Sequence, residues 1–255
     1  MKVHTFLFIA LASCFQEAEA DVTYPDGSKK AVIFSFDDGL EQDKRLVELL
    51  NQYGLVGTFN LSSGLFSQNA LWLTDFLGEP SQYVARENVA SLYAKHEIAS
   101  HSHTHPVLPN LNHSDAKYQV EKDRTLLSEL ASYPVVSFAY PLGAYNDATI
   151  EVIKAAGFTN ARTVKSTNSF TLPSNLFEWH PTVHHSEALS LAEEYVELNK
   201  VELTVFMVWG HSWEFDQNSP KNNWDYFESV LQVLADKDDI WYTTAGEFAV
   251  FYNSM

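Results

Sequence analysis

The sequence predicts an α/β fold, a distorted (β/α)7 barrel in a single domain. Short apolar runs rich in β-branched residues alternate with longer stretches of helical period, a pattern typical of repeated strand–helix–strand units. The first run leads into Phe36-Asp37-Asp38-Gly39 and not into a Gly-rich phosphate-binding turn, which favours a barrel over an open nucleotide-binding sheet. The sequence shows no linker, internal repeat or low-complexity tract, so one domain is the simplest account.

The expected strands are short apolar runs bounded by turn-forming residues. They cover Ala31–Phe36, Leu55–Asn60, Glu97–His101, Val135–Tyr140, Asn160–Val164, Leu203–Gly210 and Ile240–Thr244. Amphipathic helices are expected between most of them, and capping residues place all but the last. They are Glu41–Tyr53 ended by Gly54, one from Ser114 to Ala131, one from Asp147 to Gly157, one begun by Ser186, and Trp224–Ala235. Ser62–Ser81 and Ser166–His184 lack a clean period and are expected to be long loops, which commonly carry function.

Charge and hydropathy narrow the class of partner. The 255 residues are 45% hydrophobic, enough for a full core, and carry a formal net charge of −17. Such an acidic chain lacks the basic stripe that nucleic-acid binding requires, so a neutral or cationic partner is expected. After the N-terminus the next apolar candidate, Leu203–Gly210, has only the length of a strand, and no transmembrane helix is expected.

The N-terminus has the layout of a secretory signal. One Lys precedes an apolar run that is too short to cross a bilayer, and small residues follow. Two processing signals compete, the lipobox-like Leu11-Ala12-Ser13-Cys14 and the A-x-A pattern Ala18-Glu19-Ala20. We expect a signal peptide at 1–20, a catalytic domain at 21–255, and a secreted, periplasmic or cell-surface protein. Use of the lipobox would make it a lipoprotein anchored at Cys14.

Polar residues follow the strands at the point where each strand ends. Asp37 and Asp38 follow the first strand, His101–His105 the third and Pro141–Gly143 the fourth, while Arg162 lies in the fifth and His211 ends the sixth. The carboxyl ends of parallel strands share one face of a barrel, where such folds assemble active sites. These residues, distant in the sequence, are therefore expected to converge.

Their chemistry points to a metal. Two adjacent buried carboxylates repel each other unless a cation compensates them, although the pair alone also fits an acidic turn that caps the next helix. His101 and His105 are spaced so that a helical turn would present both imidazoles to one ion. Ser102 stands where a zinc metalloprotease has its Glu, which weakens that reading, and His103 is expected to be a non-ligand.

Two of these motifs together resemble those of a known family. Ser35-Phe36-Asp37-Asp38-Gly39 matches a T-F-D-D-G motif and His101-Ser102-His103-Thr104-His105 matches an H-[ST]-x-x-H motif. Both are motifs of the polysaccharide deacetylases, the NodB-homology enzymes of carbohydrate esterase family four. The resemblance runs from about Ala31 to Ala245 and implies a NodB-like barrel.

The resemblance also implies roles for these residues. Asp38, His101 and His105 would hold a divalent metal, usually zinc, with cobalt, nickel or manganese as alternatives. Asp37 would be the general base that activates water. His211, which ends the apolar strand after Val208-Trp209-Gly210, would be the general acid, a role that suits an imidazole near neutral pH.

The third family motif, R-P-P-Y-G, is the point of departure. It appears here as Ala139-Tyr140-Pro141-Leu142-Gly143, without the arginine that normally orients the base. We hypothesise that Arg162 replaces it, or that the base is tuned differently. The backbone N–H of Leu142 would donate to the oxyanion. Tyr140 and Pro141 are expected near the substrate, and Trp209, Trp213 or Trp179 are candidates for a sugar-facing wall.

The function expected from this resemblance is metal-dependent removal of acetyl groups from a polysaccharide or oligosaccharide, with N-acetylglucosamine polymers as the first choice and acetate as the product. The same site chemistry suits an O-acetyl esterase acting on xylan. The missing motif-three arginine also leaves open a non-catalytic carbohydrate-binding protein.

Overall fold

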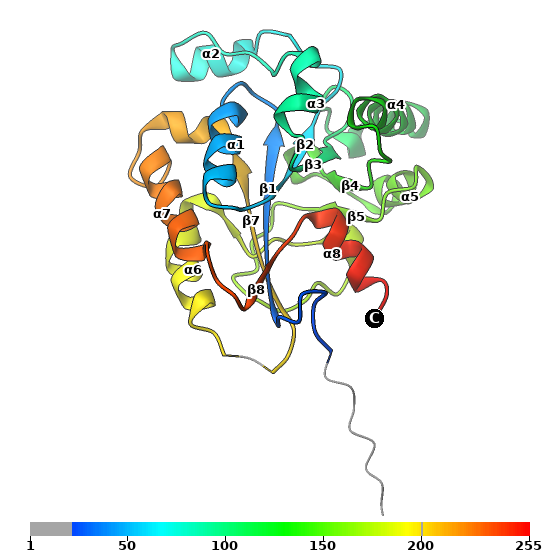
Figure 1. Cartoon of the computed structure of the whole chain (residues 1–255). Helices are drawn as coiled ribbons and strands as arrows, with labels where there is room; N and C mark the ends of the chain where they lie inside the picture. The colour runs from blue at the N-terminus through cyan, green and yellow to red at the C-terminus, as the bar shows by residue number, and fades with distance from the viewer. Residues whose placement is uncertain (1–21, 200) are drawn as a thin grey trace, which may run out of the picture.

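A curled sheet of parallel strands forms the centre of the molecule, with helices around it (Figure 1). The computed structural model describes residues 22–199 and 201–255, so the expected signal peptide and Cys14 lie outside the described residues. The described strands are β1 (Lys30–Asp38), β2 (Gly57–Leu61), β3 (Glu97–Ser100), β4 (Ser137–Ala139), β5 (Asn160–Arg162), β6 (Val183–His184), β7 (Thr204–His211) and β8 (Ile240–Tyr242). The parallel α/β barrel predicted from the alternating pattern is confirmed.

The two ends of the sheet are connected by the segment between β5 and β7, as in a distorted barrel. The strand order runs β5-β4-β3-β2-β1-β7-β6, and β8 pairs with the first residues of β1. The segment between β5 and β7 contacts both of them, because Arg162 bridges to Trp179 and Val183 pairs with Val208. β6 lies in the stretch expected to be a long loop, since its two residues are too few to give a recognisable period.

The helices connect successive strands and mostly lie where the sequence placed them. They are α1 (Asp43–Gln52), α2 (Leu71–Leu77), α3 (Val89–Leu92), α4 (His113–Ala131), α5 (Asp147–Ala155), α6 (Ala188–Val196), α7 (Trp224–Leu234) and α8 (Ala245–Tyr252). Three N-caps were assigned wrongly. Asn112 caps α4 and Asn146 caps α5, each side chain accepting a backbone N–H. Ser186 lies in a short 3₁₀ turn before α6 and does not cap it. The expected loop Ser62–Ser81 contains α2.

Within the described residues, no helix is both long enough and apolar enough to cross a membrane.

The alternation of side chains along β1 positions the site. Ala31 and Ile33 share one face and pack into a cluster with Phe248 of α8. Ser35 and Asp37 continue the same face toward the carboxyl end of the strand, where polar groups replace apolar ones. The opposite face carries Val32, Phe34 and Phe36, which belong to the larger core beneath the helices. One face of the central strand thus changes from core to candidate site along its length.

Candidate active site

A cavity of about 550 Å³ opens at the carboxyl ends of the strands and collects most of the residues singled out in the sequence. This volume lies within the range of roughly 300–1,000 Å³ that is usual for ligand pockets. The cavity is lined by Asp37, Asp38, Trp72, Tyr83, His101, His105, Leu142, Val164, Trp209, His211 and Trp213. The residues from separate strand ends therefore do converge.

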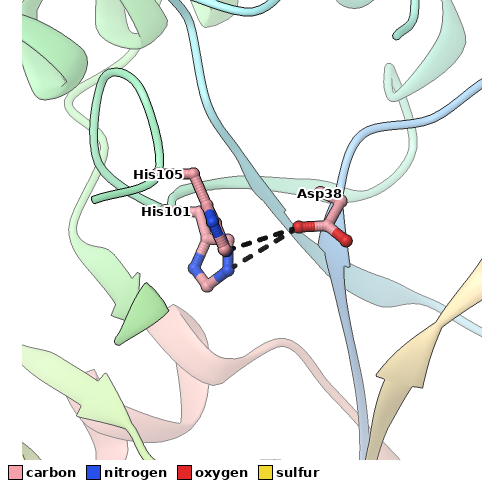
Figure 2. Close-up of side chains that lie close together, drawn as sticks. All are labelled: Asp38, His101 and His105. Atoms are coloured by element: carbon pink, nitrogen blue, oxygen red, sulfur yellow. Dashed lines mark ion pairs between the residues drawn. The ribbon is translucent and has the colours of Figure 1, made fainter. Parts of the chain in front are cut away.

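Asp38, His101 and His105 face one another across a small gap (Figure 2). Nε2 of His105 lies 3.7 Å from Oδ1 of Asp38, and Nε2 of His101 lies 3.9 Å from the same oxygen. These separations are too long for hydrogen bonds. They are close to the edge of a tetrahedron whose metal–ligand bonds are about 2.0–2.1 Å, roughly 3.3 Å. The donor set and its spacing therefore fit a divalent metal with only a small contraction.

Neighbouring groups hold His101 in the state that binds a metal. Its Nδ1 donates to the carbonyl oxygen of Ala139 at 2.8 Å, which leaves Nε2 as the free lone pair facing Asp38. Burial lowers the pKa of His101 to about 4, so the ring is neutral at neutral pH. A neutral imidazole is the form that ligates metal ions.

The backbone around these ligands departs from regular structure. The segment His101–His105 is not the helical turn that the i, i+4 spacing suggested. It is a loop in which Ser102 and His105 have positive φ angles of 65° and 56°, and this brings the rings of His101 and His105 to 4.8 Å between centroids. Asp38 has a φ of 82°. Successive strand residues normally point to opposite faces, and this turn lets Asp38 and Asp37 reach the same cavity. Left-handed non-glycine residues cost energy and cluster at functional sites.

Residues behind the loop fix its position. Asp123 of α4 is fully buried and accepts hydrogen bonds from the backbone N–H of Ser63, at 2.7 Å, and from the hydroxyl of Ser100. His103 turns away from the cavity, with its Nδ1 2.9 Å from the hydroxyl of Ser63. This placement agrees with the expectation that His103 is not a ligand.

Asp37 is buried beside the metal-ligand cluster and is held by Arg162 and Asn60. Arg162 forms a buried ion pair with Oδ1 of Asp37, and Nδ2 of Asn60 donates to the same oxygen at 2.9 Å. Oδ2 faces His101, with 4.0 Å between it and Nε2. Burial raises the pKa of Asp37, but Arg162 and the nearby imidazoles together outweigh burial and hold the pKa below its usual range.

The guanidinium of Arg162 is itself fixed from several sides. Its Nε donates to the hydroxyl of Ser35 at 2.9 Å, and Nη1 donates to the carbonyl oxygen of Thr163. Its Cζ lies 5.0 Å from the centre of the Trp209 ring. Arg162 of β5 thus contacts the carboxylate of Asp37, which the missing arginine of the third family motif would otherwise orient. Asn60 was not among the sequence candidates. Its signal is its position at the end of β2, where it pairs in register with Asp37.

His211 lies on the other side of Asp37, because β7 pairs with β1 and brings these two residues into register. Its Nδ1 is 2.6 Å from Oε1 of Glu214, a residue of the 3₁₀ turn Ser212–Gln217. Burial alone would lower the pKa of His211. The hydrogen bond to Glu214 and the nearby carboxylates outweigh burial, and the pKa rises to about 9. His211 is therefore protonated at neutral pH.

Glu214 is the centre of a polar cluster, and the sequence had suggested no role for this residue. Nε2 of His184 lies 3.1 Å from the oxygen that also faces His211, and Nδ2 of Asn222 donates to the other oxygen at 3.4 Å. Burial raises the pKa of Glu214, but the three histidines His184, His211 and His185 together lower it well below its usual range, so Glu214 is a carboxylate. The spacing of three residues from His211 was the available signal. An acidic residue one turn after a histidine is too common to single out alone.

Leu142 has a φ of 56° inside the 3₁₀ turn Pro141–Gly143, and it lines the cavity with a side chain that is 66% exposed. A leucine side chain makes this left-handed backbone conformation unfavourable. The turn around Leu142 therefore has a conformation imposed by its surroundings, and functional sites are where such strain concentrates.

The remaining candidates divide between the cavity and the core. Trp209 and Trp213 line the cavity, and Nε1 of Trp213 donates to Oδ2 of Asp38 at 3.3 Å. Tyr140 and Pro141 are buried behind it, and the hydroxyl of Tyr140 donates to the carbonyl oxygen of Phe177. Trp179 is 1% exposed and packs on Phe248, so it cannot face a sugar.

Solved structures share this fold. A polysaccharide deacetylase of Mycobacterium smegmatis matches with a TM-score of 0.62 at 16% identity, over 91% of this chain and 93% of that one. The Xyl-CE4 domain of a multidomain xylanase from the hindgut metagenome of Trinervitermes trinervoides matches with a TM-score of 0.56 at 16% identity, over 89% and 92%. A family 4 carbohydrate esterase from Streptomyces lividans, solved with acetate, matches with a TM-score of 0.52 at 17% identity, over 81% and 88%. At these identities the matches show a common fold.

No curated protein matches the chain significantly. The family model described as polysaccharide deacetylase matches residues 24–161, more than half of the sequence. This range covers β1 to β4 with Asp37, Asp38, His101 and His105, and ends before Arg162 and His211. The chain therefore belongs to the polysaccharide deacetylase family.

Proposed function

We propose that this protein is a metal-dependent hydrolase that removes N-acetyl groups from N-acetylglucosamine polymers and releases acetate. The observation that carries the proposal is that one cavity brings together a set of metal ligands, a general base and a general acid. Asp38, His101 and His105 are spaced for a metal, Asp37 is ionised beside them, and His211 is protonated on the far side of Asp37. The family is generally dependent on a divalent metal, and the imidazole and carboxylate donors suit zinc best.

Each residue has one step in the proposed reaction. Asp37, fixed by Arg162 and Asn60, takes a proton from the attacking water. The N–H of Leu142, in its constrained turn, donates to the oxyanion that develops on the acetyl carbonyl. A divalent metal held by the three ligands would supply Lewis-acid polarisation of that carbonyl and lower the pKa of water.

His211 completes the reaction by protonating the leaving group, and its environment supports an amide substrate. An amine leaves a tetrahedral intermediate only after its nitrogen is protonated, whereas a sugar oxygen is a better leaving group without help. Glu214 keeps His211 charged at neutral pH and orients its ring. An acid that is protonated at neutral pH beside the cavity can supply the proton that amide cleavage needs.

The first test is acetate release by the purified domain from N-acetylglucosamine oligomers and from acetylated xylan. Each substrate is assayed after chelation and again after zinc is added back. We expect chelator-sensitive release from the amino-sugar oligomers. Release from xylan alone would contradict the N-acetyl assignment and indicate an O-acetyl esterase.

A matched variant separates the proposed chemistry from contamination. Asp37→Asn keeps the size of the side chain and removes the base, and we expect turnover to fall by about 10²- to 10⁴-fold. Because Asp37 is buried and ion-paired, the thermal unfolding of the variant is measured in parallel. Near wild-type turnover would refute the assignment of Asp37.

We also propose that the protein acts outside the cytoplasm, which the secretory layout of residues 1–20 supports.

A further inference from the structure

The helix α2 carries an unusual concentration of exposed apolar side chains. Leu71, Trp72 and Phe76 are 68%, 45% and 62% exposed. Trp72 and Phe76 are four residues apart and so share one side of the helix. Leu73 is completely buried and packs with Tyr83 in a small separate cluster, which anchors the helix. The inner side of α2 is therefore held in place while an aromatic edge stays in solvent.

This aromatic edge continues the wall of the cavity. α2 lies beyond the carboxyl end of β1 (Figure 1). Trp72 and Phe76 both make edge-to-face contacts with Trp213, at centroid distances of 5.4 and 5.7 Å. Trp213 in turn hydrogen-bonds Asp38, and Trp72 donates to the hydroxyl of Tyr83 at 3.1 Å. A continuous row of rings thus leads from the metal-ligand cluster to the surface.

We propose that this row, Trp213, Trp72 and Phe76, is a subsite that binds the apolar face of a pyranose ring adjoining the acetylated ring in the sugar chain. The inference rests on the proposed function and adds a preference for chains over single sugars. Pyranose rings present C–H groups on their flat faces, and exposed tryptophan and phenylalanine rings offer matching apolar planes. The ring N–H groups of both tryptophans already have partners, so stacking costs no unsatisfied donor.

The charge around α2 selects a sugar over a membrane surface. The helix contains Asp75 and no basic residue, and Glu79 follows it. The whole chain carries a formal charge of −17. Interfacial membrane binding relies on lysine and arginine beside the apolar face, whereas acidic groups are repelled by anionic lipid. A neutral or cationic amino-sugar chain suits this surface.

The test compares the N-acetylglucosamine tetramer with the single sugar. For each enzyme the readout is the ratio of kcat/KM for the tetramer to kcat/KM for the monosaccharide. We expect Phe76→Ala to lower this ratio by about tenfold, since one aromatic stacking contact is of that order. Phe76→Tyr should restore it, and Val250→Ala, a similarly exposed apolar residue on α8, serves as the control for surface truncation.

Binding gives a second readout that does not depend on turnover. Titration of the tetramer against the full domain, followed by tryptophan fluorescence, should show tighter binding than the monosaccharide and a loss in Phe76→Ala. Tetramer binding without any acetate release would overturn the proposed function and support the subsite. Equal ratios and equal binding in wild type and Phe76→Ala would overturn the subsite. So would binding to phosphatidylglycerol vesicles that Phe76→Ala abolishes, because α2 would then be a membrane contact.

Discussion

Replacing Glu214 with Gln removes the charge beside His211 while keeping the shape of the side chain. The surroundings raise the pKa of His211 from 6.5 to about 9, with the hydrogen bond to Glu214 the largest of the effects that raise it. That difference corresponds to about 3 kcal/mol of stabilisation of the imidazolium. The amide oxygen of Gln can still accept a hydrogen bond from His211, but the charge of Glu214 is gone. Because a hydrogen bond to a charged group contributes about 1.5–3 kcal/mol, loss of that charge should lower the pKa by about one to two pH units.

The assay is the pH dependence of kcat/KM for acetate release from an N-acetylglucosamine oligomer. Because His211 must be protonated to act as the acid, wild-type activity should fall as pH rises through about 9. In Glu214→Gln this alkaline limb should move down by about one to two pH units. Glu187→Gln is the matched control and should not move it, because Glu187 is an exposed acid in the 3₁₀ turn before α6 and pairs with Lys221. Both variants are compared at equal zinc. An unchanged alkaline limb in Glu214→Gln would refute the role of the pair.

Three further predictions concern the supports of the site. Arg162→Ala should lower kcat/KM for acetate release by at least about 100-fold, because Asp37 loses the cation that fixes it. Arg162→Lys should lose less activity. Full activity in Arg162→Ala would show that the base is tuned without Arg162. Asp123→Ala should weaken zinc binding by about 10- to 100-fold in calorimetric titration, since it removes the hydrogen bonds that position the loop of His101. Unchanged affinity would show that the loop keeps its conformation without Asp123. Gly210→Ala should lower the free energy of unfolding by about 1–3 kcal/mol in chemical denaturation, because the added Cβ would lie 2.0 Å from Nδ1 of the buried His185. An unaltered denaturation midpoint would mean that the His185 ring can shift.

Much of the fold follows from local pattern. β1 and β7 are apolar on both faces, as expected of central parallel strands, and the helical periods of α1 and α7 are long enough to read. β6, α3 and α2 were missed because two, four or seven residues do not establish a period. α8 was also missed, although Thr244 and Glu247 form a capping box at its start. α2 also has no capping side chain, so neither of the usual sequence signals for a helix start was present.

The site was less predictable than the fold because its supports come from tertiary contacts. The histidines of the cavity could be identified from their spacing, but the helical turn expected for His101–His105 is a loop with two left-handed residues. Asn60 and Glu214 carry no motif, and only the strand register and the turn after β7 bring them to Asp37 and His211. Sequence spacing identifies ligand types, while the groups that orient them depend on which strands become neighbours.

Acetate release is expected to depend on a metal held by Asp38, His101 and His105. The most direct measurement determines the zinc content and the acetate release of the same preparations of wild type, His105→Ala and His103→Ala. His105 faces Asp38 at 3.7 Å, whereas His103 turns toward Ser63, so the two variants remove neighbouring histidines with opposite orientations. We predict one zinc per chain and full release in wild type, near-complete retention of both in His103→Ala, and loss of both in His105→Ala. Zinc and activity retained in His105→Ala would contradict the account.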